Sequence, residues 1–233
     1  MSASDITLTA ADGGEFGAYL AAPASGSGAG VVVLQEIFGI NRVIRDIADR
    51  LAARGYFAIA PDLFWRQEPG IQITDQSEAE WARAFELYQG FDEALGIEDA
   101  KVALAHLRGL EGCTGKVGSV GFCLGGKLAY LMATRSDADC SVGYYGVGIE
   151  NALDEAGNIA KPLLLHIAEN DEFVPPEAQA KIKAALGDNP LVTIYSYPGL
   201  NHAFTRIGGA HYDQAGAELA HGRSAAFFAE HLA

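Results

Sequence analysis

Short runs of apolar and β-branched residues recur along this chain, and most are followed by a stretch with helical periodicity. The clearest run is GVVVLQE at residues 30–36, and similar strand-like runs occupy 57–64, 116–121, 162–168 and 192–199. Strands that are apolar on both faces are typical of a parallel sheet buried between helices. Strand and helix alternating at this rhythm predict an α/β fold, with a mostly parallel central sheet and helices on both faces.

The segments between these runs carry the helical patterns. In residues 41–56 apolar side chains recur at helical spacing, and Gly55 closes the pattern. Further helices are expected at 78–88, 97–110, 124–134, 175–187 and the C-terminus, with a surface loop at 67–77 and a short strand at 141–145. The N-terminal residues alternate with period two around the turn DGG, which predicts a hairpin. Because no internal repeat or long linker divides the chain, residues 1–233 are expected to form a single domain.

Composition limits the partners and the compartment that we expect. The 233 residues carry a formal net charge of −14 without a basic cluster, which argues against nucleic-acid binding. The N-terminus lacks the basic and apolar regions of a secretory signal, and no run of about 18 apolar residues could span a membrane. Three cysteines without metal-ligand spacing, Cys113, Cys123 and Cys140, argue against zinc and against a disulfide framework. We therefore expect a cytoplasmic protein that uses no metal or other cofactor.

The segment GFCLG at residues 121–125 places Cys123 between two glycines, at the junction of a strand and a helix. This spacing is typical of a tight turn in which side chains two residues before or after the nucleophile would collide with backbone. The turn raises the nucleophile above the sheet edge, and the N-terminus of the following helix favours a thiolate. Cys123 is therefore a candidate nucleophile; the alternative is a small apolar residue that packs at the end of a buried strand.

Two further chemically capable residues stand at strand ends after Cys123. Asp171 lies just past one apolar run and His202 just past the next, each in a loop. The carboxyl ends of parallel strands meet at the ligand crevice, and this chain order is the one that a triad of the α/β-hydrolase fold requires. Two flanking carboxylates remain alternatives for the acid: Glu169 and Glu172. The other histidines are interpreted mostly as surface or packing residues: His106, His166, His211, His221 and His231.

A second carboxylate, Glu36, ends the first long apolar run. In this fold the loop after that strand donates one backbone N–H to the oxyanion hole, and the residue after the nucleophile donates the other. Ile37 and Leu124 occupy those two positions. A carboxylate near the nucleophile is unexpected in a serine hydrolase. Glu36 is therefore either part of a thiol site or a surface acid beside a helix.

Five motifs together resemble the dienelactone hydrolase (carboxymethylenebutenolidase) family of α/β-hydrolases. They are QEIFG at 35–39, PDLF at 61–64, GFCLGG at 121–126, VGYYGVG at 142–148 and NHAF at 201–204. The resemblance implies a carboxylic ester hydrolase in which Cys123, Asp171 and His202 form the triad. It also implies that Glu36 keeps the resting thiol neutral and accepts its proton when substrate arrives. A thiol that ionises only at that moment is protected from oxidation.

One feature of the family pattern is missing. The resemblance implies two arginines that hold the substrate carboxylate, but only Arg206 matches, and Trp81 stands at the position of the other. We therefore expect weaker carboxylate recognition and a broader, more aromatic pocket, unless Trp81 merely packs and Arg206 is sufficient. The residues expected to contact substrate are Arg206, Phe38, Trp81, Phe85 and Tyr145.

The residues and the resemblance predict a hydrolase that opens dienelactone-type lactones or activated esters through a covalent thioacyl-enzyme. On dienelactone the product would be maleylacetate, an intermediate of aromatic-compound catabolism. One alternative is a broader carboxylesterase or thioesterase of the same fold with an unrelated substrate. Another is a redox sensor in which Cys123 pairs with Cys113 or Cys140, although a sensor needs no ordered acid and histidine. The expected partner is a small lactone or ester, with no nucleic acid or membrane, and the protein is expected to be a monomer.

Overall fold

Strands and helices alternate along residues 2–233, the part of the chain that the computed structural model describes. Internal contacts divide the chain into two units, Met1–Gly118 and Ser119–Ala233. The single domain expected for residues 1–233 stays a prediction. No helix within residues 2–233 has both the length and the apolar character that crossing a membrane requires.

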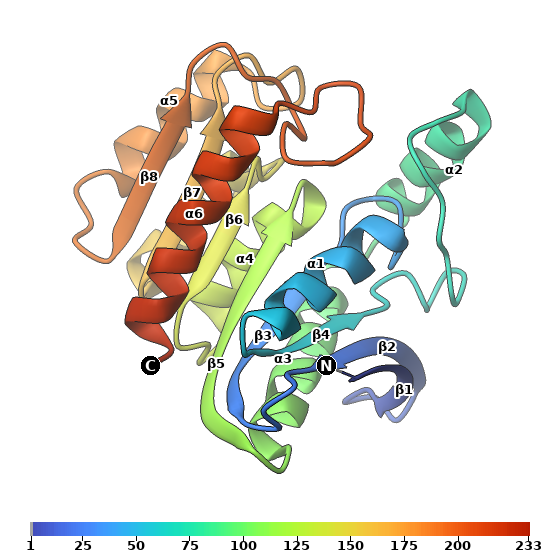
Figure 1. The fold of residues 1–233 in the computed structure, drawn as a ribbon. Coiled ribbons are helices and arrows are strands. Elements are labelled where there is room, and N and C mark those ends of the chain that lie inside the picture. Colours follow the sequence, from blue (N-terminus) through green and yellow to red (C-terminus); the bar gives the residue numbers. More distant parts are fainter. Residues whose placement is uncertain (1) are drawn as a thin grey trace. The chain divides into compact units, whose positions relative to one another are not determined.

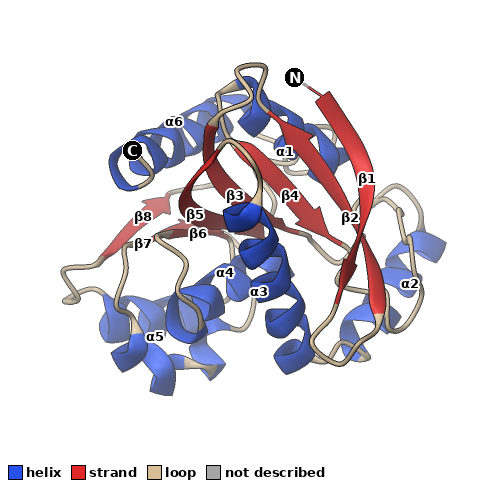
Figure 2. Ribbon diagram, turned by 90° about the horizontal axis from the view of Figure 1, so that it is seen from below, coloured by secondary structure: helices blue, strands red, loops and turns tan. Residues whose placement is uncertain are grey.

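The first unit is built around a small sheet with a helix on each face. Its elements are β1 (Ser2–Thr9), β2 (Glu15–Ala22), β3 (Gly28–Leu34), α1 (Arg42–Ala53), β4 (Phe57–Pro61), α2 (Glu78–Gln89) and α3 (Glu93–Gly109). The strand order is β1-β2-β4-β3, with the predicted hairpin antiparallel and β3 parallel to β4. Helices α1 and α3 cover opposite faces of β3 and β4 (Figure 2). The apolar run at 31–34 is fully buried between them.

The second unit contains a fully parallel sheet. Strand β5 (Cys113–Phe122) runs through the boundary and is followed by α4 (Leu124–Arg135), β6 (Ser141–Tyr144), β7 (Leu163–Ala168), α5 (Pro176–Leu186), β8 (Val192–Tyr197) and α6 (Gln214–His231). The strand order is β5-β6-β7-β8. Helix α6 covers one face, and α4 and α5 cover the other (Figure 1). The predicted α/β class, with mostly parallel strands and helices on both faces, is confirmed.

The parallel strands of the second unit all end at the same edge of their sheet. Cys123 follows β5, Tyr145 follows β6, and the loops after β7 and β8 carry Asp171 and His202. Four residues that are far apart in the sequence are therefore brought to one edge by topology alone.

Two local features differ from the sequence prediction. Helix α3 begins at Glu93 rather than near residue 97, because the Asp92 side chain caps it by accepting a hydrogen bond from the Leu95 N–H (3.0 Å). Two short 3₁₀ turns, Ile149–Asn151 and Leu153–Asn158, also occupy the connection between β6 and β7.

Helix α6 is fixed to its sheet by polar as well as apolar contacts. His166 of β7 is 1% exposed; its Nδ1 bonds the Tyr197 hydroxyl on β8 (2.6 Å), and its Nε2 bonds the Ser224 hydroxyl on α6 (2.9 Å). Burial, together with the nearby Arg223 and His221, lowers the pKa of His166 to about 3. His166 is therefore a neutral, doubly hydrogen-bonded link, and more than the packing residue suggested by its strand position.

Mild acid is expected to destabilise the fold through His166. Its pKa is about 3 when folded against 6.5 for an ordinary histidine, so below pH 6.5 the unfolded chain binds a proton that the folded protein does not. As the pH falls towards 5, the free energy of unfolding should lose up to about 1.4 kcal/mol per pH unit from this residue. Urea unfolding of the wild type and of His166→Gln across this range measures the effect. Equal pH slopes in the two proteins would contradict the assignment.

Candidate active site

Cys123 forms the sharp turn between β5 and α4. Its backbone has φ 56° and ψ −115°, a conformation that costs a non-glycine residue of order 1–3 kcal/mol. The neighbouring glycines are sterically required. A Cβ on Gly121 would lie 1.8 Å from the Gly125 carbonyl oxygen, and one on Gly126 would lie 2.3 Å from that of Tyr144. The tight turn expected from the glycine spacing is therefore present, with Cys123 at the N-terminus of α4.

Backbone hydrogen bonds hold this turn in place. The Cys123 N–H donates to the carbonyl of Tyr144 on β6 (3.1 Å), and the Cys123 carbonyl accepts from the Gly126 N–H (2.9 Å). Leu124 is the first residue of α4, so its N–H has no acceptor within the helix. N–H groups in this position are suited to binding an anion.

His202 and Asp171 form a buried pair. Nδ1 of His202 lies 2.8 Å and 3.0 Å from the two carboxylate oxygens of Asp171. Oδ1 of Asp171 also accepts the backbone N–H groups of Phe173 (2.8 Å) and Val174 (3.2 Å). The neighbouring Glu172 is exposed and faces His211 instead. Of the acids considered from sequence, Asp171 is therefore the one that orients His202.

The electrostatics of His202 link it to Cys123. Burial opposes a charged imidazole, but the Cys123 sulfur and the Asp171 carboxylate outweigh it and raise the pKa of His202 to about 10. Within residues 2–233, the buried Nε2 of His202 makes no hydrogen bond of good geometry. The sulfur is thus close enough to stabilise an imidazolium without a fully formed hydrogen bond. Such catalytic contacts commonly tighten when substrate binds.

Aromatic rings enclose the His202 imidazole. Tyr145 and Phe173 meet it edge-on, with ring centroids 5.0 Å and 4.8 Å away, and the Tyr145 hydroxyl is 2.8 Å from that of Thr205. Sequence analysis identifies Tyr145 but misses Phe173 and Thr205, whose only signal is their proximity in sequence to Asp171 and His202. These contacts restrict the imidazole to the orientation that faces Asp171.

The loop after β8 turns sharply behind His202. Ala203 has φ 58°, and its carbonyl accepts the backbone N–H of Arg206 (2.9 Å). Arg206 is 8% exposed. The arginine expected to contact substrate is therefore held in the same tight turn as the histidine.

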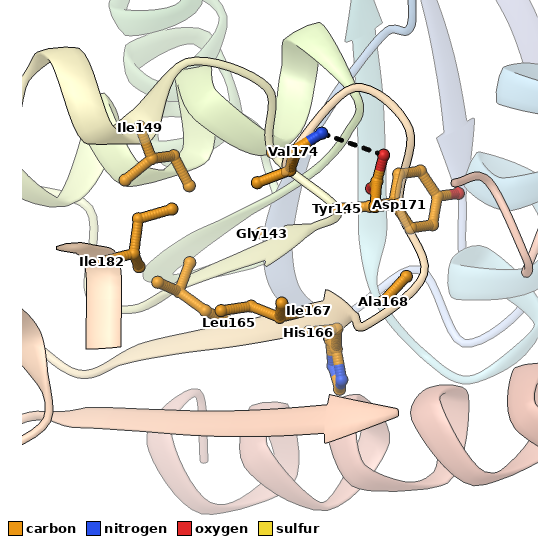
Figure 3. Close-up of a pocket in the computed structure, with 11 residues that line it drawn as sticks. Gly143, Tyr145, Ile149, Leu165, His166, Ile167, Ala168, Asp171, Val174 and Ile182 are labelled. Carbon is orange, nitrogen blue, oxygen red and sulfur yellow. Dashed lines mark hydrogen bonds between the residues drawn. The ribbon is translucent and has the colours of Figure 1, made fainter. Parts of the chain in front are cut away.

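A small cavity lies beside the loop that carries Asp171 (Figure 3). Its lining includes Tyr145, Leu165, Val174 and Ile182, and its volume of about 10 Å³ corresponds to roughly one water molecule. The carboxylate of Asp171 stands at its margin, bonded to the Val174 N–H. The cavity is too small for a lactone ring and is not a substrate pocket.

The remaining predicted site residues lie in the first unit. Glu36 and Ile37 follow β3 and are 2% and 6% exposed, so Glu36 is not the surface acid of the alternative interpretation. Phe38 meets Trp81 of α2 edge-on at 5.1 Å, and Trp81 stacks on Phe85 at 5.5 Å. An aromatic cluster therefore adjoins the loop of Glu36 and Ile37.

The other cysteines do not share the geometry of Cys123. Cys113 begins β5, and Cys140 is buried just before β6. Cys123 is the cysteine with positive φ, at a strand-to-helix turn. Among the described residues, no group of three or more His, Cys, Asp or Glu side chains is arranged to hold a metal ion.

Comparison with known proteins gives one consistent result. Residues 16–232 match the sequence profile of the "Dienelactone hydrolase family". The chain is 51% identical over 240 residues to a "Putative carboxymethylenebutenolidase" of Azospirillum brasilense, covering 98% of this chain and 99% of that one. It is 38% identical over 229 residues to the "Carboxymethylenebutenolidase" of Pseudomonas putida, covering 98% and 97%.

A solved structure agrees with these relatives. The "Putative Dienelactone Hydrolase" of Klebsiella pneumoniae superposes with a TM-score of 0.84 at 27% identity, covering 98% of this chain and 99% of that one. The match extends over nearly all of both chains, so it includes the fold as well as the local motifs. The chain therefore belongs to the dienelactone hydrolase family, has the α/β-hydrolase fold, and is a carboxylic ester hydrolase.

Proposed function

We propose that this enzyme opens dienelactone-type lactones or activated esters through a Cys123–His202–Asp171 triad and a covalent thioacyl-enzyme. The observation that carries the proposal is the buried His202–Asp171 pair, whose imidazole is stabilised as a cation by the sulfur of a strained Cys123. Relatives named carboxymethylenebutenolidase along the full chain support a lactone as the substrate.

In the proposed first step, the Cys123 thiolate attacks the lactone carbonyl carbon. The N–H groups of Ile37 and Leu124 stabilise the oxyanion, and Glu36 accepts the thiol proton as substrate arrives. The ring C–O bond then breaks, leaving a thioester on sulfur and an enolate, which takes the proton that the His202 imidazolium carries. In the second step the now neutral His202 removes a proton from water, which attacks the thioester. The carboxylate product leaves, and the departing thiolate takes back the proton that Glu36 accepted, which restores the thiol.

A thiol suits this substrate class because the leaving group is already stabilised. In an enol lactone the leaving oxygen becomes an enolate, so the acyl group is activated and the weaker base strength of sulfur is no disadvantage. A simple amide would demand a harder step. With dienelactone as substrate the product is maleylacetate, which places the proposed role in aromatic-compound catabolism.

The experiment that tests the proposal is a substrate panel. Purified enzyme is assayed with cis- and trans-dienelactone, simple lactones and p-nitrophenyl esters, with and without prior thiol alkylation. The proposal expects dienelactones to have the highest kcat/KM and alkylation to abolish every activity. Hydrolysis that survives complete alkylation of Cys123 would refute it.

Replacing Trp81 with arginine is expected to favour anionic lactones over neutral esters. Trp81 occupies the position of an expected carboxylate-binding arginine. Its indole N–H already donates a hydrogen bond to the Asp75 carbonyl (3.0 Å). A charge-assisted hydrogen bond contributes about 1.5–3 kcal/mol, so the ratio of kcat/KM for anionic to neutral substrates should rise roughly ten- to hundredfold in Trp81→Arg.

The matched control for this prediction is Trp81→Met, which removes the indole without adding charge. Its ratio of anionic to neutral activity should stay close to that of the wild type. An unchanged ratio in Trp81→Arg would mean that Trp81 only packs against Phe38 and Phe85 and that Arg206 alone binds the carboxylate.

A broader carboxylesterase or thioesterase is the second candidate function. The cluster of Phe38, Trp81 and Phe85 favours it, since these rings offer an apolar surface where a second arginine is absent. The same substrate panel separates the two. Higher kcat/KM for neutral aromatic esters than for either dienelactone would select this alternative.

A further inference from the structure

Four side chains form a continuous hydrogen-bonded chain inside the second unit. It runs from Tyr197 of β8 through His166 of β7 and Ser224 of α6 to Tyr144 of β6, with distances of 2.6 Å, 2.9 Å and 2.6 Å. We propose that this chain is a positioning network that holds Cys123 and His202 in their reactive arrangement. The proposal rests on the proposed function only in naming Cys123 as the nucleophile.

The network has one direction. The Tyr144 hydroxyl donates to the Ala220 carbonyl (3.2 Å), so its oxygen accepts the hydrogen of Ser224. Ser224 then accepts from Nε2–H of His166, and Nδ1 of His166 accepts from the Tyr197 hydroxyl. Each of the four side chains therefore has a hydrogen-bond partner in a single arrangement of donors and acceptors. Because His166 is neutral, it keeps one donor and one acceptor nitrogen, as this arrangement requires. A satisfied buried network fixes one geometry, which apolar packing alone does less strictly.

The backbones of the same residues hold the reactive groups. The Tyr144 carbonyl accepts the N–H of Cys123 (3.1 Å), and the His166 carbonyl accepts the N–H of Tyr145 (2.8 Å). Tyr145 is kept at φ 38°, and its ring meets the His202 imidazole edge-on. The first of these hydrogen bonds holds the backbone of Cys123, and the second holds Tyr145, whose ring contacts His202.

Tyr144 is the member closest to the nucleophile turn. Its ring stacks on Phe122, the residue just before Cys123, with centroids 4.7 Å apart. Its carbonyl leaves no space for a Cβ on Gly126, so the first turn of α4 is pressed against it. A shift of the Tyr144 side chain would therefore move the backbone that carries the sulfur. Misplacement of reacting groups by about 1 Å can cost up to a hundredfold in rate.

The test variant is Ser224→Ala, which breaks the network at its centre and leaves every proposed catalytic residue in place. We expect kcat on the best lactone or ester to fall about tenfold with KM nearly unchanged. We also expect the His202 titration midpoint, followed by ¹⁵N NMR, to drop by about one pH unit, because the pKa of His202 is raised by Cys123 and Asp171 at close range.

The matched control is Ser119→Ala. Ser119 of β5 also forms a buried hydroxyl pair in the second unit, with Ser141 at the start of β6 (2.9 Å), three strand positions before the Phe122–Tyr144 pair that adjoins Cys123. Ser119→Ala should lower the unfolding temperature about as much as Ser224→Ala does, while leaving kcat and the His202 titration midpoint unchanged. If Ser224→Ala fails to fold, Tyr197→Phe removes one terminal hydroxyl and tests the same expectation.

The NMR midpoint requires no substrate, so it separates this inference from the proposed function. An unchanged midpoint in the folded variant overturns the positioning role even if activity falls. A lowered midpoint supports it even if lactones prove to be poor substrates. Identical effects of Ser224→Ala and Ser119→Ala would also overturn it, because the network would then only stabilise the fold.

Discussion

Replacing Cys123 with alanine is expected to lower kcat/KM for lactone hydrolysis by roughly 10⁴-fold or more. The thiol is the only group in the proposed mechanism that can form the acyl-enzyme, and loss of a nucleophile leaves only the contributions of binding and oxyanion stabilisation. The strained backbone of Cys123, at φ 56°, positions the side chain of this residue, and alanine would leave no nucleophile there. The measurement is a comparison of steady-state kinetics on the same lactone.

The control for this prediction is Cys113→Ala, since Cys113 is a partly exposed free thiol at the opposite end of β5 from the nucleophile turn. It should retain wild-type activity. Activity that persists in Cys123→Ala would remove the thioacyl mechanism. Peroxide-driven formation of a disulfide at Cys123, without any loss of hydrolysis in the alanine variant, would support the redox-sensor alternative instead.

Asp171→Asn is expected to have the second-largest effect, a fall in kcat of about 10³–10⁴-fold. Both carboxylate oxygens of Asp171 face Nδ1 of His202 at 2.8 Å and 3.0 Å, which fixes the ring and favours its charged form. An amide removes the charge and can stabilise the wrong tautomer, while its oxygen can still accept the Phe173 and Val174 N–H groups. The loss should therefore be catalytic, with little unfolding.

Glu172→Gln is the matched control for this second prediction, because it neutralises the next carboxylate along the same loop. Its kinetics should equal those of the wild type, and its His202 titration should be unchanged. If Glu172→Gln were as damaging as Asp171→Asn, the assignment of the acid would be wrong.

The chemistry-bearing positions were predictable because they follow from local rules. The glycine spacing around Cys123 reflects the collision that a Cβ on residue 121 would make with the carbonyl of residue 125, and this collision is determined within one short segment of sequence. Asp171 and His202 each follow an apolar strand, and parallel strands place their ends at one edge. These predictions need only the identity of the strands and their order along the chain, and the apolar runs in the sequence indicate both.

The supporting contacts could not be predicted in this way. His166 and Ser224 are 58 residues apart and meet only when α6 packs across β7. Nothing near His166 in the sequence distinguishes a network histidine from a packing one. Likewise, Tyr145 and Ala203 have positive φ although neither is a glycine, so the sequence does not indicate this backbone conformation. Long-range hydrogen bonding, and not local propensity, decides these positions.

Identifying the acid that orients His202 requires both the sequence and the structure. From sequence, Asp171 competes with two glutamates in the same loop, and spacing alone does not separate them. In the structure, Asp171 is buried against His202, and the N–H groups of Phe173 and Val174 hold its Oδ1. A short local turn therefore selects the residue, but its side-chain direction becomes visible only in three dimensions.

Mass spectrometry of the enzyme during turnover shows directly whether Cys123 carries the acyl group. A slowly hydrolysed ester is mixed with the enzyme, the reaction is quenched in acid, and the peptides are analysed. We expect the peptide containing Cys123 to carry the acyl group, as an adduct that hydroxylamine removes. Continuous turnover with that peptide unmodified, or an acyl group on another residue, would contradict it.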